Sequence, residues 1–298
     1  MSTQLRAADL RLPPGPVDLT SVDSGATPGV DAGKKSGKKS GKKSGKKSGK
    51  AALAALGEGL SDLQERLYAE GVADVGHGRS VLLVLQGMDT SGKGGTLRHT
   101  VGLVDPQGLR ISSFKKPTAE ELEHDFLWRI RKALPGKGII GVFDRSHYED
   151  VLIVRVHQLA PAEEIERRYD AINAFEAEVA AAGVTLVKCM LHISPKTQKE
   201  RLLARLDDPT KHWKFNPGDV DEREHWAAYR EAYEIALERT NTEVAPWYVI
   251  PSDRKWYRNL AIGQLLHETL TNMSPQWPAA DFDVDEQKRR LADEAPVT

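Results

Sequence analysis

The stretch that decides the fold is Ser80–Gly95, which reads SVLLVLQGMDTSGKGG. Its first seven residues form a short apolar run rich in valine and leucine, which is typical of a buried strand. The next nine fit the pattern G-x-x-x-x-G-K, and a segment that can be helical follows from about Thr96. In such a unit the loop N–H groups surround a phosphate, the helix start adds positive potential, and Lys93 reaches the phosphate. We therefore predict a phosphate-binding loop rather than a plain glycine-rich turn. Its further phosphate ligands would be Thr90, Ser91, Gly92, Gly94 and Gly95.

The loop departs from the usual pattern at one position. Gly94 stands where such loops normally carry the Ser or Thr whose hydroxyl binds Mg²⁺, and Asp89 lies inside the loop instead. A carboxylate directed at a phosphate would repel it unless a cation lay between them. Asp89 is therefore a candidate Mg²⁺ ligand, and the alternative is a turn residue that caps the following backbone.

A second acidic residue follows another apolar run. The segment 138–144 reads GIIGVFD and predicts a buried strand that ends on Asp144. An acid in this place beside a phosphate-binding loop is the Walker B arrangement, in which the carboxylate holds the metal. The next residue, Arg145, can bridge phosphate oxygens or form a structural ion pair with a neighbouring acid such as Glu149. We interpret His147 as a hydrogen-bonded residue at a helix start rather than as a general base.

Basic residues also gather further along the chain. Arg201 and Arg205 lie four apart on one face of a predicted helix, and Lys211 and Lys214 follow beyond a proline-containing turn. Such a patch, over residues of about 201–220, can close over phosphates as a helical lid that excludes water. Alone, these charges would be interpreted as solvated surface. Next to a phosphate-binding loop and a Walker B acid, we favour the lid.

The remaining patterns alternate strands with helices. Further strands are expected at 109–114, 185–193 and 247–251, and helical spacing covers 120–134 and 162–182. Asp221 with Glu224 resembles a capping box ahead of another helix. On that helix, Trp226, Tyr229 and Tyr233 lie at i, i+3 and i+7 and are interpreted as core. The alternation predicts an α/β fold with a parallel sheet flanked by helices on both faces.

Charge divides the chain into a basic N-terminal segment and an acidic body. Residues 1–50 contain eleven basic and four acidic side chains, a net +7, whereas residues 51–298 contain 31 and 39, a net -8. Four copies of Gly-Lys-Lys-Ser fill residues 33–48 without an apolar side chain. We therefore predict a disordered tail over residues 1–50, as a solvated linker or as a binder of acidic polymers. The folded domain would span residues 51–274, with an acidic tail at 275–298.

Composition narrows the classes of protein further. The acidic body argues against a nucleic-acid-binding domain, so no sequence-specific nucleic acid partner is expected. One cysteine, Cys189, cannot form an internal disulfide, and no apolar run approaches the roughly 20 residues of a membrane span. These features predict a soluble, cytoplasmic protein without a membrane partner.

Several separated motifs resemble the polyphosphate kinase 2 family. In chain order they are LQGMDTSGK (85–93), DPQG (105–108), SFKKPT (113–118), HDFLWR (124–129), DRSHYED (144–150) and APWYVIP (245–251). The likeness runs from about Leu53 to Asn272. The SHYED stretch and WKF (213–215) resemble class III of the family, whose members use inorganic polyphosphate to phosphorylate nucleoside mono- and diphosphates.

The resemblance implies a P-loop kinase fold with a helical lid. It also implies that Asp89 and Asp144 hold Mg²⁺, for which Mn²⁺ can substitute, and that Arg145, Lys93 and the lid arginines grip the transferring phosphoryl group. A homo-oligomer is implied as well. The nucleotide side would include Phe114, Pro117 and Arg129, and a basic channel for the polyphosphate would include Lys115 and Lys116.

Motifs and resemblance together predict the reaction. The protein would transfer the terminal phosphoryl group of polyphosphate to AMP or ADP, reversibly and without a covalent enzyme intermediate, with ATP as one product. One alternative is an ordinary nucleotide kinase that takes phosphate from ATP. Another is a binding protein, tethered to polyanions by its basic tail, whose kinase site is degenerate. The intact set of Asp89, Lys93, Asp144 and Arg145 argues against degeneracy.

Overall fold

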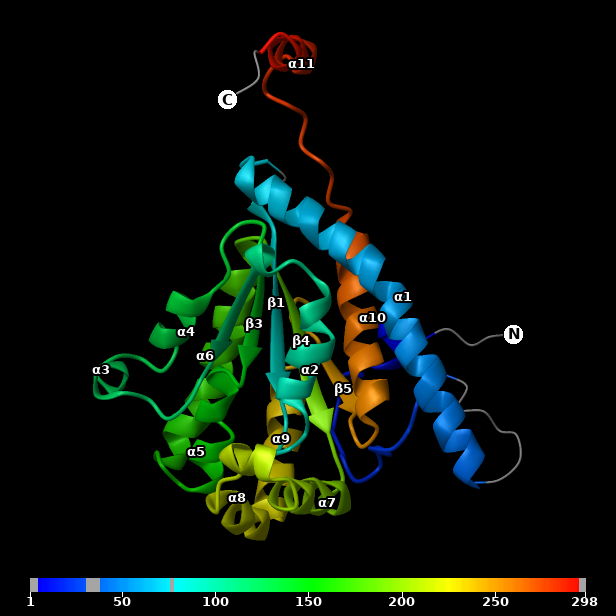
Figure 1. The fold of residues 1–298 in the computed structure, drawn as a ribbon. Coiled ribbons are helices and arrows are strands. Elements are labelled where there is room, and N and C mark those ends of the chain that lie inside the picture. The colour runs from blue at the N-terminus through cyan, green and yellow to red at the C-terminus, as the bar shows by residue number, and fades with distance from the viewer. Residues whose placement is uncertain (1–4, 31–37, 76–77, 295–298) are drawn as a thin grey trace.

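The computed structural model describes residues 5–30, 38–75 and 78–294. Its centre is a five-stranded parallel sheet in the order β2-β3-β1-β4-β5 (Figure 1). The strands are β1 (Ser80–Gln86), β2 (Leu109–Ser113), β3 (Ile140–Asp144), β4 (Val184–His192) and β5 (Trp247–Pro251). The helices are α1 (Lys38–Val72), α2 (Lys93–His99), α3 (Ala119–Leu122), α4 (Trp128–Ala133), α5 (Ile153–Val156), α6 (Ala162–Ala181), α7 (Pro195–Leu206), α8 (Gly218–Asp221), α9 (Trp226–Arg239), α10 (Lys255–Met273) and α11 (Val284–Ala292). Short 3-10 turns join several of these elements.

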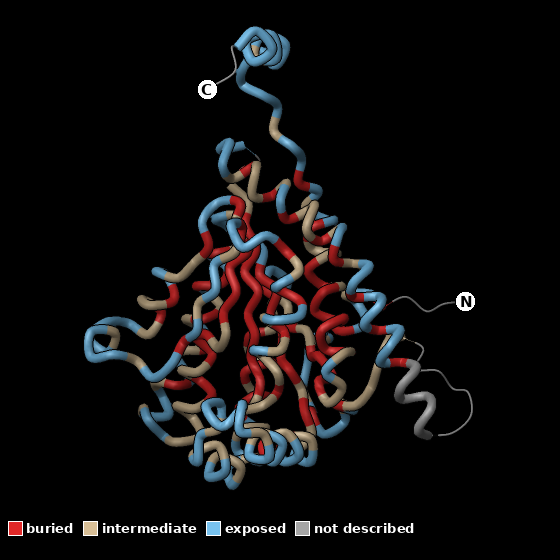
Figure 2. Tube along the Cα trace, in the orientation of Figure 1, coloured by how far each residue is buried: buried red, intermediate tan, exposed pale blue. Residues whose placement is uncertain are grey.

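The sheet is covered on both faces because alternate side chains of its strands point to opposite sides. Leu82 and Val84 of β1 pack in one core cluster with residues of α6 and α9. Val81, Leu83 and Leu85 pack in the other with residues of α1 and α10. Figure 2 shows the resulting buried centre, with the strands between two helical layers. The predicted α/β class and all five predicted strands are confirmed.

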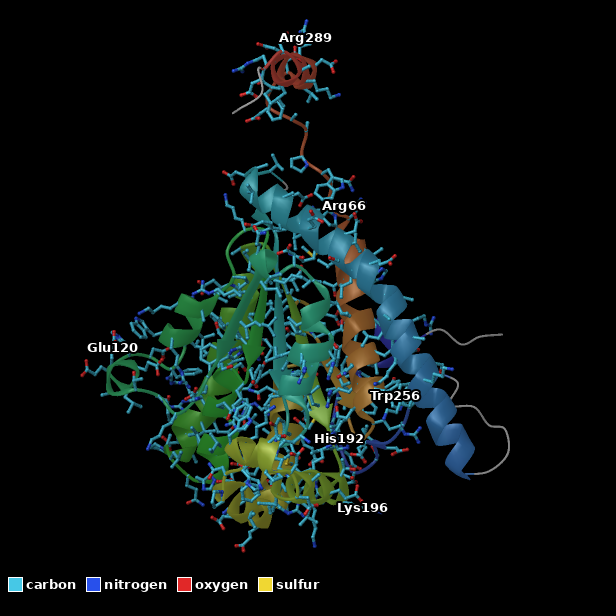
Figure 3. All side chains as sticks on the ribbon, viewed as in Figure 1. Arg66, Glu120, His192, Lys196, Trp256 and Arg289 are labelled. Carbon is cyan, nitrogen blue, oxygen red and sulfur yellow. The ribbon has the colours of Figure 1, made fainter. Side chains whose placement is uncertain are left out.

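The helix predicted over residues 120–134 is wrong as a single element. The chain forms α3 and α4 there, with a break between them. At the break Asp125 Oδ1 accepts a hydrogen bond from the N–H of Leu127 (3.0 Å). This local bond replaces a helical one, since short acidic side chains compete with the helix for backbone N–H groups. Glu120 lies on the projecting segment that includes α3 (Figure 3).

The capping box predicted at Asp221 is also wrong. Asp221 has helical backbone angles (φ -63°, ψ -42°) and makes no side-chain capping bond. Helical turns run almost without interruption from α8 to α9, so no free helix start needs a cap at this position. A capping box does form at Thr118 and Glu121, ahead of α3.

The prediction of disorder is wrong for residues 5–30. Leu5, Leu10 and Leu19 are buried in the two core clusters. The segment also pairs with the edge strand β5: the N–H of Leu12 donates to the carbonyl of Trp247 (2.8 Å). Composition could not reveal this, because the few apolar residues of the segment find partners only after the distant strand β5 has formed. The folded unit therefore includes residues well before the predicted boundary at residue 51.

Disorder is also wrong for the later repeats, because α1 begins at Lys38 and includes them; residues 33–37 lie outside the described residues. A four-residue period places successive glycines near one face of a helix. Gly45 and Gly49 are buried, and a Cβ on Gly49 would lie 2.1 Å from Cε3 of Trp256 in α10. Figure 3 shows Trp256 where α10 approaches α1. The glycines therefore allow the two helices to approach closely.

The described residues after α10 extend from the body and include α11, which has no buried residue. Figure 1 shows α11 standing apart from the sheet and its helices, and Arg289 marks it in Figure 3. Of the helices that the structure describes, none combines the length and the apolar character needed to cross a membrane.

Candidate active site

The phosphate-binding loop follows the carboxyl end of β1, at the edge of the sheet where all the parallel strands end. Gly87 (φ +150°) and Gly92 (φ +117°) take up backbone conformations that favour glycine, and Thr90 adopts φ +61°. These turns fold the loop tightly, and α2 begins directly after Gly92. The predicted strand–loop–helix unit is thereby confirmed in its geometry.

Lys93 is held at the base of this loop. Its Nζ donates to the carbonyl oxygen of Gly87 (2.7 Å). Burial lowers the pKa of Lys93, and the positive charge of Arg145 lowers it further. The carboxylates of Asp89, Asp144 and Glu149 act in the opposite direction. Charged residues of two segments, the loop and the end of β3 with the turn after it, therefore lie close enough to act on one ammonium group.

Arg145 links the loop to the end of β3. Its guanidinium contacts Asp89 Oδ1 (3.2 Å) and Glu149 Oε2 (3.4 Å). Arg145 has φ +66°, an uncommon backbone conformation for a residue with a side chain. Burial would lower the pKa of Arg145, but Glu149 and Asp89 outweigh it and raise that pKa. The structural ion pair with Glu149, which was the alternative role for Arg145, is thus present, and Arg145 also contacts the loop through Asp89.

Asp144 ends β3 beside the last residues of β1. The register pairs Asp144 with Leu85, two residues before the loop begins. The carboxyl end of β3 therefore lies at the same edge of the sheet as the loop, as the Walker B arrangement requires. Asp89 and Asp144 approach Lys93 from the loop and from β3, respectively.

Helix α7 supports the loop from the side. Arg201 Nη1 donates to the carbonyl oxygens of Thr90 (2.7 Å) and Ser91 (3.0 Å), and its Nη2 donates to those of Ser252 and Asp253 (2.5 and 3.1 Å). Three residues earlier, Gln198 Nε2 donates to the carbonyl of Asp89 (3.2 Å). The structure therefore gives Arg201 backbone partners in the loop where we expected a lid residue that grips phosphate.

The predicted lid region folds as the end of α7, a 3-10 turn and α8. Arg205 Nη1 donates to the carbonyl of Lys214 (2.9 Å) and to Asp219 Oδ2 (3.3 Å). From this region Asn216, Gly218 and Asp219 reach the cavity beside the loop. Polar and acidic residues of the region therefore face the site, and Arg205 bonds within the region itself.

A cavity of about 230 Å³ opens between the loop and this region. Its walls include Asp89 and Arg145. Three aromatic side chains complete them, Trp226, Tyr229 and Tyr233. The prediction that this aromatic stripe is core is wrong for the first two, which are only partly buried, whereas Tyr233 is buried. Of the remaining lining residues, Gly87 and Met88 belong to the predicted loop, and Asn216, Gly218 and Asp219 belong to the predicted lid region. The sequence did not indicate the others: Glu149, Leu152, Ile153, Gln198 and Glu222.

The residues predicted to bind the nucleotide lie in the loop after β2 and in α4. The Arg129 guanidinium lies 5.6 Å from the centre of the Phe114 ring and donates to the carbonyl of Lys115 (2.8 Å). Pro117 is half-buried and Lys116 is exposed in the same loop. These residues come together as a group, but none of them lines the cavity.

Asp150 joins this group to the end of β3. Arg129 and Arg168 approach its carboxylate to 3.8 and 3.6 Å, and its Oδ2 has no hydrogen-bond partner among the described residues. Burial raises the pKa of Asp150 to about 6, against the lowering effect of the two arginines.

A buried polar cluster stands behind the Walker B segment. Lys188 Nζ contacts Glu176 Oε2 (2.6 Å) and donates to Tyr148 Oη (2.9 Å), and all three side chains are fully buried. His147 Nε2 lies 3.3 Å from Glu176 Oε1. Burial lowers the pKa of His147. The interpretation of His147 as a hydrogen-bonded structural residue is confirmed, and no signal in the sequence identified Glu176 or Lys188 as its partners.

These elements define the class of the protein. A parallel α/β sheet whose central strand runs into a glycine-rich phosphate-binding loop, with an acid at the end of the adjacent strand, is the architecture of P-loop kinases. The chain belongs to the polyphosphate kinase 2 family: a sequence model of that family, described as Polyphosphate kinase 2, matches residues 43–278. The resemblance found in the motifs is thereby confirmed.

Individual relatives agree with this assignment. The chain is 48% identical to the AMP/ADP-polyphosphate phosphotransferase of Meiothermus ruber over 227 residues, which make up 76% of this chain and 83% of that protein. It is 42% identical to the ADP-polyphosphate phosphotransferase of Rhodopseudomonas palustris over 233 residues, 74% of this chain and 78% of that protein. The crystal structure of Polyphosphate Kinase 2 from Arthrobacter aurescens TC1 superposes with a TM-score of 0.89 at 48% identity and covers 99% of both chains.

Proposed function

We propose that this protein is a polyphosphate-dependent nucleotide kinase, which transfers the terminal phosphoryl group of polyphosphate to AMP or ADP. The names of the relatives from Meiothermus ruber and Rhodopseudomonas palustris support this substrate pair. The observation that carries the proposal is the set at the loop: Lys93 fixed at its base, with Arg145 and Asp89 in contact at its mouth. A degenerate site would not retain this arrangement.

The chain's own contribution to catalysis is positioning and charge. Phosphoryl transfer needs little covalent participation by the protein, because the reacting oxygens must mainly be aligned while negative charge is neutralised. Lys93 is held by the carbonyl of Gly87, so its ammonium group meets a bound phosphate without a costly rearrangement. Arg145 supplies a planar guanidinium suited to two phosphate oxygens.

The acids at the loop suit a divalent cation. Mg²⁺ is usually bound by one or two protein carboxylates, with water and substrate phosphates completing its shell. Asp89 and Asp144 offer two carboxylates next to Lys93, and in the described ranges no group of three or more His, Cys, Asp or Glu side chains forms a closed metal cage. Hard oxygen donors that leave room for phosphate fit Mg²⁺, or Mn²⁺ in its place. When bound, such an ion would neutralise phosphate charge.

The acceptor nucleotide would bind beside β2, near Phe114, Pro117 and Arg129. The guanidinium of Arg129 is fixed over the Phe114 ring, and Lys115 and Lys116 extend the positive charge of this side. The polar face of α8 would cover the opposite side and limit the access of water. Exclusion of water matters because a phosphoryl group transferred to water is lost as inorganic phosphate.

The decisive experiment omits ATP. The protein is incubated with AMP, linear polyphosphate and Mg²⁺, and nucleotides are separated by chromatography. Formation of ADP, and then ATP, supports the proposal. A strict requirement for added ATP would support the ATP-dependent kinase, and binding of polyphosphate without any product would support the tethered binding protein. Lys93→Ala, purified in the same way, shows whether a contaminating kinase produces the signal.

A further inference from the structure

A second arginine lies beneath the phosphate-binding loop, outside every motif that the sequence displays. Arg258 belongs to α10 and is 2% exposed. Its Nη1 donates to the carbonyl oxygen of Ser91 (3.1 Å). Its Nε and Nη2 donate to Asn259 Oδ1 (3.1 and 2.8 Å). One hydrogen bond therefore joins the guanidinium to the loop, and the two to Asn259 fix its orientation on α10.

Two loop glycines leave the space that this guanidinium fills. A Cβ on Gly92 would lie 1.6 Å from Arg258 Nη1, and a Cβ on Gly95 would lie 2.6 Å from Nη2. Gly95 lies in the first turn of α2, where the backbone would accept other residues, so the nearby guanidinium accounts for the glycine. The intervening Gly94 has nothing within 4 Å of its Cβ position. The close approach is therefore specific to the side of the loop that faces Arg258.

The hydrogen-bond acceptors around this arginine are neutral. Burial, together with the positive charge of Arg201, lowers the pKa of Arg258 to about 9. Buried charges are costly unless opposite charge or hydrogen bonds compensate them. In the part of the chain that the structure describes, the hydrogen bonds of Arg201 and Arg258 all go to carbonyl or amide oxygens. Negative charge placed on the loop would therefore be stabilised by both arginines.

We propose that Arg258 is a positioning residue of the phosphate-binding loop, which fixes the Ser91 carbonyl and fills the space beside Gly92 and Gly95 so that the loop keeps its shape for a phosphate chain. The inference rests on the proposed function, in which this loop binds phosphates of polyphosphate or of the nucleotide. Arg258 contacts the loop and not the reacting atoms, so its effect passes through the loop.

The test measures binding separately from turnover. Arg258→Met removes the charge and the hydrogen bonds with a side chain of similar length, and Arg258→Lys keeps the charge alone. Linear polyphosphate and ATP are each titrated in a thermal-unfolding assay. For at least one of the two ligands, we expect Arg258→Met to raise the half-maximal concentration about tenfold, the size of one lost hydrogen bond to a charged group. Arg258→Lys should recover part of that loss.

Substitution of the glycine tests the contact itself. In the wild-type background, Gly95→Ala should weaken the binding of the same ligand, because the new Cβ displaces the guanidinium of Arg258. In the Arg258→Met background the same substitution should cost much less, since the guanidinium is gone. Equal losses in the two backgrounds would overturn the proposed contact. If Arg258→Met fails to fold, as judged by circular dichroism, Arg258→Lys provides the second background.

The matched control is Arg289→Met on the exposed helix α11, which removes one positive charge far from the loop. It should leave the binding of both ligands unchanged. Unchanged affinity of Arg258→Met for both polyphosphate and ATP would overturn the positioning role. Failure of the proposed function would look different: wild-type protein would not convert AMP with polyphosphate, while the binding assay would still report on the loop.

Discussion

Two fully enclosed cations, Lys188 and Arg258, lie on different sides of the sheet and are compensated differently. Lys188 Nζ contacts the carboxylate of Glu176, with Tyr148 and the Thr240 carbonyl as further partners. Arg258 meets the Ser91 carbonyl and the Asn259 side chain. The Lys188 cluster is electrically complete without a ligand, whereas the positive charge beneath the loop is not. A buried cation that is paired with a carboxylate stabilises the fold, whereas one with only neutral partners favours the binding of an anion.

The largest effect on stability is expected when the ion pair between Lys188 and Glu176 is broken. Lys188→Met leaves Glu176 buried without its ammonium partner, so the free energy of unfolding should fall by about 3–5 kcal/mol. Denaturant titration followed by circular dichroism measures the change. The double variant Lys188→Met with Glu176→Gln should regain part of the loss, because it removes the isolated negative charge. If Lys188→Met were as stable as the wild type, the pair of Lys188 and Glu176 would not stabilise the fold.

Loss of Lys93, the cation at the base of the phosphate-binding loop, should reduce activity more than stability. Lys93→Ala should lower kcat for polyphosphate-dependent phosphorylation of AMP about 10²- to 10³-fold, as removal of one electrostatic group from a transition state typically does. Its free energy of unfolding should change far less than that of Lys188→Met, because Lys93 donates to the neutral carbonyl of Gly87, whereas Lys188 contacts the buried carboxylate of Glu176. Steady-state kinetics and denaturant titration on the same preparation decide this. A large loss of stability with normal kcat would reverse the comparison.

Asp150 is an intermediate case, because two arginines approach it but do not fully compensate its burial. Its pKa is raised from 3.8 to about 6 in the folded protein. The folded state therefore binds more protons than the unfolded state between these values, and stability falls as the pH rises from about 4 to 6. The contribution is at most about 3 kcal/mol. Denaturant titrations across this range should show a weaker pH dependence for Asp150→Asn than for the wild type.

The smallest effect is expected for a partly exposed ion pair at the surface. Arg66 Nη2 and Asp62 Oδ2 lie 2.8 Å apart on α1, four residues apart in sequence. Such helix pairs contribute about 0.3–0.5 kcal/mol, and salt screens them. Asp62→Asn should therefore change the free energy of unfolding by no more than this, with normal kcat. A loss of stability comparable to that of Lys188→Met would mean that burial does not determine how much an ion pair contributes to the stability of this protein.

The sequence predicted the sheet well because its strands are local apolar runs, each of which carries its own signal. It also predicted the loop residues and Asp144, since their chemistry follows directly from the strand that precedes each of them. The break at Asp125 was missed, because one side-chain hydrogen bond outweighed a helical spacing. The role of Trp226 was missed because a stripe on a helix has the same pattern whether it faces a core or a cavity.

Residues that act through distant contacts were harder to predict. Arg201 was paired in the sequence with Arg205, but its structural companion is Gln198, three residues earlier on the face that meets the loop. That i, i+3 spacing was a usable signal. Arg258 had none, because its partner Ser91 lies 167 residues away in the chain. The roles of the predicted phosphate, metal and nucleotide ligands, and the homo-oligomer, stay predictions.

The N-terminal segment has a consequence for how the chain completes its fold. Residues 10–12 pair with β5, so this segment covers a strand that is synthesised much later in the chain. Until then Leu5, Leu10 and Leu19 lack the surface that buries them, and the outer edge of β5 is open to pairing with other chains. A nascent chain must therefore keep this segment unpaired until β5 has been synthesised. A shortened protein that begins near residue 50 would expose this edge permanently and would tend to aggregate.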